Sequence, residues 1–258
     1  MLAIRDLHVR LSGRPILSGI SLAVDPGTLT AIVGPSGSGK STLLRAISGE
    51  IGYSGTVALN GCEVGAAAPE ALARQRAVLP QETQVAFSFT AAEVVALGAH
   101  GGPPPPRARI EALLARVGLA GMAGRLVQNL SGGERQRVHL ARVLLQAGAP
   151  VGPEGPHWLF LDEPVASLDI AQQLAVMRIA RAHADGGGGV LAVMHDLNLS
   201  AMFADRIVVL SRGRVVTAGP PAEVLTGAMI ETVYGCRIPV CTLPEKGPWL
   251  LVQAAGAP

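Results

Sequence analysis

Short apolar runs alternate with longer amphipathic stretches along most of the chain. Alternating apolar and polar residues predict two strands near the start, over 2–11 and 20–24, joined by a turn at 12–15. An Asn-Gly pair at 60–61 predicts a hairpin turn. The other apolar runs predict strands at 29–33, 56–59, 77–80, 157–161, 190–194, 207–210 and 214–217, and the amphipathic runs predict helices at 92–97, 109–117, 132–147, 170–184 and 196–204.

This order of elements predicts an α/β fold with a mostly parallel core sheet, preceded by an antiparallel β region. From about 90 to 148 the periodicity is helical, which predicts an inserted helical subdomain, with a stiff proline run at 103–106. Residues 149–156 hold prolines at 150, 153 and 156 and are predicted to form a loop with no strand. We expect one domain over 1–232, with a core at 1–87 and 155–232, a helical lobe at 88–154 and a tail at 233–258.

Composition excludes several classes of protein. Among 258 residues the net charge is +2 and 16% of residues are charged, so no nucleic-acid partner is expected. Hydrophobic residues make up 49% of the chain, yet its apolar runs end far short of the ~18 residues that a membrane span needs. The three cysteines are widely spaced, which argues against a disulfide framework or a zinc site and favours packing roles.

A glycine-rich segment after the strand at 29–33 carries the clearest chemical signal. Glycines let the backbone point N–H groups at phosphate oxygens, and the next helix adds the positive end of its dipole. The lysine reaches the outer phosphates, and the serine after it is a candidate Mg²⁺ ligand. The segment fits G-x-x-x-x-G-K-[ST] without a mismatch and consists of Gly34, Pro35, Ser36, Gly37, Ser38, Gly39, Lys40, Ser41 and Thr42.

Two adjacent carboxylates, Asp162 and Glu163, follow the apolar strand at 157–161. Ligands of open α/β sheets sit at the carboxyl ends of strands, so this position suits a catalytic pair. Asp162 is expected to hold Mg²⁺ through water, and Glu163 to act as the general base for the water that attacks the γ-phosphate. The alternative is that the two acids cap the next element.

The string at 130–137 combines a capping box with two glycines. Ser131 and Glu134 have the spacing of a capping box for the helix that runs to about 147. Gly132 and Gly133 lie in the first turn, where glycine costs about 1 kcal/mol relative to alanine. In return, they leave a bare helix N-terminus that can contact a phosphate.

Taken together, these segments make the chain similar to an ABC-type ATPase subunit, a phosphate-loop NTPase. The similarity covers roughly residues 1–230 and is highly specific, because six motifs occur in the family's order and spacing. The segments are 34–42, Gln81, 130–136, 161–164, 167–169 and His195.

The resemblance implies a head-to-tail homodimer that encloses two ATP molecules with Mg²⁺. Gln81 then contacts Mg²⁺, His195 contacts the γ-phosphate, and Asp169 lies at the dimer seam. Ser131, Gly132, Gly133 and Glu134 bind the ATP held by the opposite subunit. From the residues alone, His195 is equally compatible with a packed residue at a strand end.

Finer features resemble one group of transporters. Residues 71–81, 86–90 and 193–199 are similar to ATPases of haem, ferric-siderophore and cobalamin importers, and residues 149–161 are most similar to the haem importer subunit. That likeness implies a translocase at the cytoplasmic face of the inner membrane, bound peripherally to two permease subunits. Contact is expected through 81–90, where Phe87 and Phe89 lie, and through the helical lobe. A periplasmic binding protein takes part indirectly.

Further observations bear on this interpretation. The family usually places an aromatic residue near the end of the first strand to stack on adenine, whereas the matching position here is Leu11, next to Val9 and His8. A soluble ABC ATPase of the iron–sulfur assembly type remains an alternative, as does a siderophore or cobalamin importer. A small-molecule kinase leaves 130–136 unexplained. The cargo cannot be read from this chain, because cargo contacts belong to the permease and the binding protein.

Overall fold

The computed structural model describes residues 1–81, 88–99, 104–242, 248 and 250. Its strands are β1 (Leu2–Leu11), β2 (Arg14–Val24), β3 (Leu29–Val33), β4 (Ser54–Leu59), β5 (Cys62–Glu63), β6 (Arg76–Leu79), β7 (Val151–Gly152), β8 (Gly155–Pro156), β9 (Trp158–Asp162), β10 (Gly189–Val193), β11 (Arg206–Ser211) and β12 (Arg214–Gly219). Its helices are α1 (Lys40–Ile47), α2 (Pro69–Gln75), α3 (Ala91–Ala96), α4 (Arg107–Arg116), the 3-10 turn η1 (Val127–Asn129), α5 (Gly132–Ala147), α6 (Ile170–Asp185), α7 (Leu197–Phe203), α8 (Pro221–Val224) and α9 (Gly227–Tyr234).

A six-stranded sheet in the order β12-β11-β3-β10-β9-β6 forms the core. All its neighbouring strands are parallel except β12, which pairs antiparallel with β11. β3, β9 and β10 are buried at every residue, as expected for parallel strands covered on both faces. The predicted α/β fold with a mostly parallel core is confirmed.

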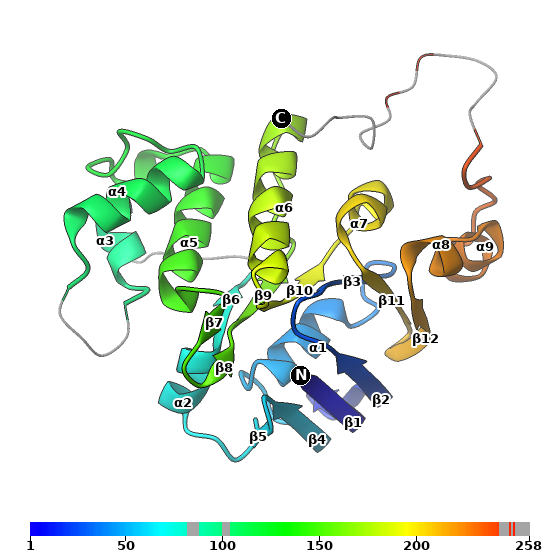
Figure 1. The fold of residues 1–258 in the computed structure, drawn as a ribbon. Helices are drawn as coiled ribbons and strands as arrows, with labels where there is room; N and C mark the ends of the chain where they lie inside the picture. Colours follow the sequence, from blue (N-terminus) through cyan, green and yellow to red (C-terminus); the bar gives the residue numbers. More distant parts are fainter. Residues whose placement is uncertain (82–87, 100–103, 243–247, 249, 251–258) are drawn as a thin grey trace.

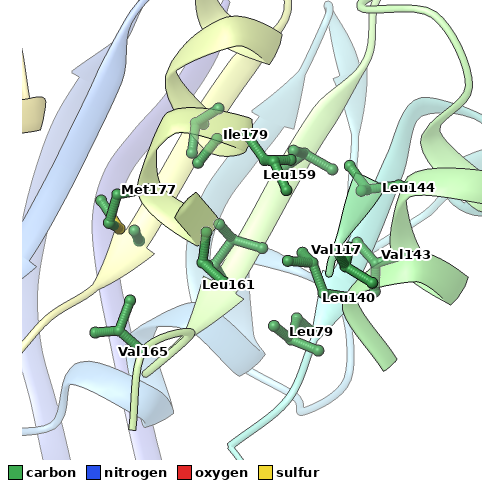
Figure 2. Close-up of a cluster of buried hydrophobic side chains, with 14 of the residues drawn as sticks. Leu79, Val117, Leu140, Val143, Leu144, Leu159, Leu161, Val165, Met177 and Ile179 are labelled. Carbon is green, nitrogen blue, oxygen red and sulfur yellow. The ribbon is translucent and has the colours of Figure 1, made fainter. Parts of the chain in front are cut away.

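Side chains of β9 divide between the two faces of this sheet. Leu159 and Leu161 pack with α5 and α6 in one hydrophobic cluster, and Figure 2 shows them between the side chains of those helices. Trp158 and Phe160 face the other way, into a second cluster with α1 and the N-terminal strands. The indole N–H of Trp158 donates to Asn60 Oδ1 at 3.1 Å, so this buried ring leaves no polar atom unpaired.

A four-stranded sheet in the order β2-β1-β4-β5 covers α1 from the other side, as Figure 1 shows. Its pairings are antiparallel, and the turn at Asn60 and Gly61 joins β4 to β5 as predicted. The helix α1 therefore lies between two sheets, with Leu43, Leu44 and Ile47 buried. This packing fixes the direction in which the start of α1 points.

The helices α3, α4 and α5 gather at one side of the core sheet (Figure 1). α3 and α5 begin with capping boxes of the same kind, built by Thr90 with Glu93 and by Ser131 with Glu134. The start of α3 is also tied to η1, because Val127 N donates to Phe89 O at 2.9 Å. The boundaries of a helical lobe at 88–154 and a tail at 233–258 stay predictions.

Three local predictions were wrong. β7 and β8, with two residues each, form a hairpin inside the predicted loop at 149–156. The two strands pair only with each other, so the N–H groups that the prolines lack are not needed by any neighbouring strand. β2 begins at Arg14 instead of residue 20, because Pro15 is tolerated in an edge strand of its sheet. Cys236 and Cys241 are exposed and not packed, whereas Cys62 is half-buried.

No helix in the described part of the chain combines the length and the apolar character that crossing a bilayer requires.

Candidate functional site

The glycine-rich loop follows β3 and delivers Lys40 at the first position of α1. Gly34 has φ +151°, and a Cβ there would lie 2.0 Å from the backbone oxygen of Leu210, so only glycine fits. Gly39, with φ +102°, is the N-cap residue of α1, and it has no side chain that could cap the helix. The N-terminus of α1 therefore remains bare, which suits an anion.

Lys40 is 5% exposed, yet its ammonium group contacts only neutral groups among the described residues. Nζ donates to Gly34 O at 2.9 Å and to Pro35 O at 3.1 Å. Burial lowers the pKa of Lys40, and the carboxylates of Glu163 and Asp162 act in the opposite direction. A buried cation without an ion-pair partner in this part of the chain fits the triphosphate expected at this loop.

Asp162 ends β9 and is 4% exposed. Ser41 Oγ donates to Asp162 Oδ1 at 3.1 Å, so the two predicted metal ligands are in direct contact. Burial raises the pKa of Asp162, while the hydrogen bond from Ser41 lowers it. Ser41, Asp162 and the exposed Gln81 line one small pocket of about 270 Å³, and their hydroxyl, carboxylate and amide oxygens are hard donors that fit Mg²⁺.

Glu163 and His195 form a close pair at the ends of neighbouring strands. His195 Nε2 lies 2.6 Å from Glu163 Oε1, and the two side chains are 52% and 16% exposed. His195 is therefore not the buried packing residue of the alternative interpretation. Glu163 is held at φ +51°, its N–H donates to Val193 O at 3.1 Å, and its carbonyl accepts from Gln136 Nε2 at 2.8 Å.

The alternative role for the acidic pair, capping the next element, does not apply. α6 is capped by Asp169, whose Oδ1 accepts from Gln172 N at 2.9 Å. Asp169 thus has a local structural role, and its predicted place at a dimer seam stays a prediction.

A cavity of about 470 Å³ joins these groups. It is lined by the phosphate loop, the first turn of α1, Gln81, Glu163 and His195, and by one residue that the sequence analysis missed, Ile16 on β2. Ile16 was missed because the second strand was predicted to begin only at residue 20. Leu11, the position expected near adenine, ends β1 and is exposed, and its place beside the base stays a prediction.

The residues at the start of α5 lie elsewhere. Ser131, Gly132, Gly133 and Glu134 do not line this cavity. Ser131 Oγ accepts from Glu134 N at 3.3 Å, and Glu134 Oε2 accepts from Ser131 N at 2.8 Å, which confirms the capping box. The hydrogen bonds from Ser131 lower the pKa of the Glu134 carboxyl. The structure therefore brings the core residues together and leaves this group apart.

Of the two phenylalanines expected at a permease groove, Phe87 lies outside the described residues. Phe89 is partly buried and packs against the core cluster.

A family model described as "ABC transporter" matches residues 17–166, which is more than half of the chain. The chain belongs to the ABC transporter family. The match includes the phosphate loop, the start of α5 and the acidic pair, whereas Asp169 and His195 lie beyond it. As an ABC ATPase, the chain binds ATP and couples its hydrolysis to transport.

Relatives and solved structures extend this likeness over nearly the whole chain. The "Hemin import ATP-binding protein HmuV" of Jannaschia sp. (strain CCS1) is 54% identical, with 95% of this chain and 91% of that protein covered. The protein of the same name from Rhizobium meliloti (strain 1021) is 52% identical, with 99% of each covered. The structure of cbiO1 from Clostridium perfringens, part of the ABC transporter complex cbiONQ, has a TM-score of 0.73 and 27% identity, with 90% of this chain and 92% of that chain covered.

A bacterial Atm1-family ABC exporter with ATP bound has a TM-score of 0.76 and 28% identity. It covers 87% of this chain, whereas this chain covers 39% of that longer one.

Proposed function

We propose that this chain is the ATP-hydrolysing motor subunit of a bacterial importer for haem. The observation that carries the motor role is the Glu163–His195 pair at 2.6 Å beside the cavity that holds Lys40. Support for haem as cargo comes from relatives about half identical over nearly the full chain, which are named for hemin import.

Within the site, the phosphate loop from Gly34 to Thr42 binds the triphosphate, and Lys40 neutralises its outer oxygens. Ser41, Asp162 and Gln81 hold Mg²⁺, which when bound neutralises charge on the β- and γ-phosphates. Glu163 takes the proton of the attacking water, and the geometry suits this because its carboxylate is only 16% exposed and faces the cavity. His195 orients Glu163 and contacts the γ-phosphate.

A second copy of the chain completes each site. Ser131, Gly132, Gly133 and Glu134 are set apart from their own cavity, and their helix N-terminus suits a phosphate from another subunit. Asp169 lies at the resulting seam of a head-to-tail homodimer. Because each ATP then contacts both copies, ATP favours the closed dimer, and hydrolysis reopens it.

The motor acts on two permease subunits at the cytoplasmic face of the inner membrane, where it is bound peripherally. Contact runs through about 81–90 and the helical lobe at 88–154, where Leu97, the residue directly after α3, is 61% exposed. The domain spans 1–232, with its core at 1–87 and 155–232 and a tail at 233–258. A periplasmic binding protein delivers cargo and contacts this chain only through the permease.

Reconstitution with the cognate permease in liposomes tests this function. Haem-loaded binding protein should raise ATP hydrolysis several-fold and drive haem into the lumen, and Glu163→Gln should abolish both. Glu154→Gln, at an exposed carboxylate in the β7–β8 turn, is the matched control and should leave both unchanged.

Two results would count against the proposal in different ways. Full hydrolysis without a permease, and no uptake with one, would contradict the transport role. Uptake of a ferric siderophore or cobalamin in place of haem would contradict only the cargo.

A further inference from the structure

Glu163, the proposed general base, lies on a strained piece of backbone. It begins the turn at 163–168, which leads from β9 to α6, and its φ of +51° is unfavourable for a residue that has a Cβ. The direction of its side chain depends on this φ, because rotation about the N–Cα bond moves Cβ relative to the strand. Relaxation of Glu163 to a negative φ would therefore turn the carboxylate away from its place beside His195 and the cavity.

Three hydrogen bonds hold the backbone of Glu163 in this conformation. Its N–H donates to Val193 O of β10 at 3.1 Å, and its carbonyl accepts from Ala166 N at 3.2 Å within the turn. The third bond is the shortest and comes from a side chain, because Gln136 Nε2 donates to the same carbonyl at 2.8 Å. The first two bonds belong to the sheet and to the turn itself, so the bond from Gln136 is the one that fastens the base from another element.

Gln136 lies near the start of α5, a helix that is packed firmly in the core. Val138 and Leu140, further along the same helix, are buried. The first turn of α5 also lies against the turn at 163–168, since a Cβ on Gly133 would be 3.2 Å from Ser167 O. The amide of Gln136 is uncharged. A positively charged donor here would weaken a neighbouring general base, whereas an amide orients the backbone and leaves the charge near the base unchanged.

Gln146, near the other end of α5, allows a comparison on the same helix. Its Nε2 also donates to backbone carbonyls, at 3.1 Å to Arg76 O and at 3.4 Å to Ala73 O. Both glutamines thus tie α5 to neighbouring backbone, but the carbonyls that Gln146 contacts belong to β6 and α2. Of the two, Gln136 is the one whose bond ends on the proposed base.

We propose that Gln136 is a positioning residue for ATP hydrolysis, which holds the backbone of Glu163 in the conformation that aims its carboxylate at the attacking water. The amide of Gln136 is already bonded to the backbone of the base, so Gln136 acts through Glu163 and not on the nucleotide. The inference rests on the proposed function, since it takes Glu163 as the general base.

Gln136→Met in the reconstituted permease complex tests this role, because methionine has nearly the shape of glutamine and no N–H to donate. We expect kcat for ATP hydrolysis to fall about 10- to 100-fold, since a displacement of about 1 Å at a reacting group can cost that much. KM and equilibrium binding of ATP should stay within about twofold of wild type. Gln146→Met is the matched control, and its kcat should stay within about twofold. An unchanged kcat in Gln136→Met, or an equal fall in both variants, would overturn the proposal.

The double variant with Glu163→Gln shows whether the effect passes through the base. In single-turnover hydrolysis, Gln136→Met should cause no further loss in this background, because a positioning residue has no effect once the group that it positions is removed. A further loss as large as the one in the wild-type background would show that Gln136 acts elsewhere and would overturn the assignment. Thermal melts check the fold of each variant. Where Gln136→Met does not fold, Gln136→Ala, which also removes the amide, is measured in the same way.

Glu163→Gln also separates this inference from the function on which it rests. Loss of hydrolysis in Glu163→Gln without a fall in Gln136→Met would refute the positioning role and leave the motor role intact. Full hydrolysis in Glu163→Gln would contradict the assignment of the base, and with it both the proposed mechanism and the role of Gln136.

Discussion

Two groups of predicted site residues are held in very different ways. Lys40 and Glu163 line one cavity, and Asp162 accepts a hydrogen bond from Ser41 in the wall of that cavity. All three lie at a strand end or at the start of α1 and are nearly or largely buried. Ser131 and Glu134 lie on a helix end in solvent and bond to each other. The first group depends on the packing of the whole core, whereas the second is complete within four residues. One copy of the chain therefore presents the triphosphate cavity and, apart from it, an exposed helix end, which agrees with the proposed exchange between two copies.

We expect the largest effect from replacing Glu163, the proposed general base of the first group. Glu163→Gln keeps the shape of the side chain but cannot accept a proton, so ATP hydrolysis should fall about 10²–10⁴-fold. ATP should still bind, and the dimer should accumulate with ATP trapped. Phosphate release and size-exclusion chromatography with ATP measure the two results. Hydrolysis within tenfold of wild type would rule out Glu163 as the base.

Removing the buried ammonium group comes next. Lys40→Ala should weaken ATP binding about 10- to 100-fold, because charge-assisted hydrogen bonds to phosphate are lost. Fluorescent ATP binding measures this loss, and a thermal melt checks the fold. Arg109→Ala removes an exposed cation on α4 and should leave ATP binding unchanged. Equal effects of the two variants would contradict the role given to Lys40.

The two capping boxes allow a matched test of the second group. Ser131→Ala and Thr90→Ala each remove the same cap and should each cost about 1 kcal/mol of stability. Only Ser131→Ala should also lower the hydrolysis rate of the isolated chain, by about tenfold, because only its helix end serves a second subunit's ATP. Denaturant melts and phosphate release compare the pair. Equal hydrolysis rates in the two variants would show that the start of α5 does nothing beyond capping.

The last prediction concerns the buried body of α5 and leaves the site itself unchanged. Burial, together with smaller contributions from the nearby Arg142 and Arg135, lowers the pKa of His139 to about 4. Neither ring nitrogen has a hydrogen-bond partner among the described residues. The unfolded chain therefore binds a proton that the folded chain excludes between pH 6.5 and 4, and stability should fall by a few kcal/mol at most as the pH drops through this window.

Denaturant melts between pH 7 and 4 measure the slope of the unfolding free energy against pH. His139→Leu should flatten it, and His8→Gln, at a histidine in the exposed part of β1, should not. The buried His183, whose pKa is also lowered by burial, contributes a slope of the same sign that remains in His139→Leu. An unchanged slope in His139→Leu would exclude this source.

Much of the molecule could be predicted from local sequence because its signals are local. The phosphate loop and the capping box at Ser131 need only a few consecutive residues, and the α/β order follows from periodicity. The two wrong strand predictions share one cause, since a proline within a single segment, such as Pro15 or Pro156, predicts the end of a strand. Both lie where no neighbouring strand needs their missing N–H, and sheet order cannot be read from one segment.

Contacts between distant segments could not be predicted from the sequence for the same reason. Ile16 reaches the cavity because the turn at Gly213 packs on β2, about two hundred residues further along the chain. The separation of Ser131 from the cavity likewise depends on how α5 packs on the sheet. The spacing of residues along the sequence predicts neither the position of Ile16 nor that of Ser131.

The positive φ of Glu163 has a consequence for which substitutions this position can accept. Its φ of +51° is a conformation that glycine adopts freely and that costs other residues about 1 kcal/mol or more. Folding alone would therefore accept glycine here, and the chain retains a residue that its own stability does not favour. Selection for stability and selection for activity oppose each other at this position. Variants chosen only for a higher melting temperature should lose the carboxylate before they lose the fold.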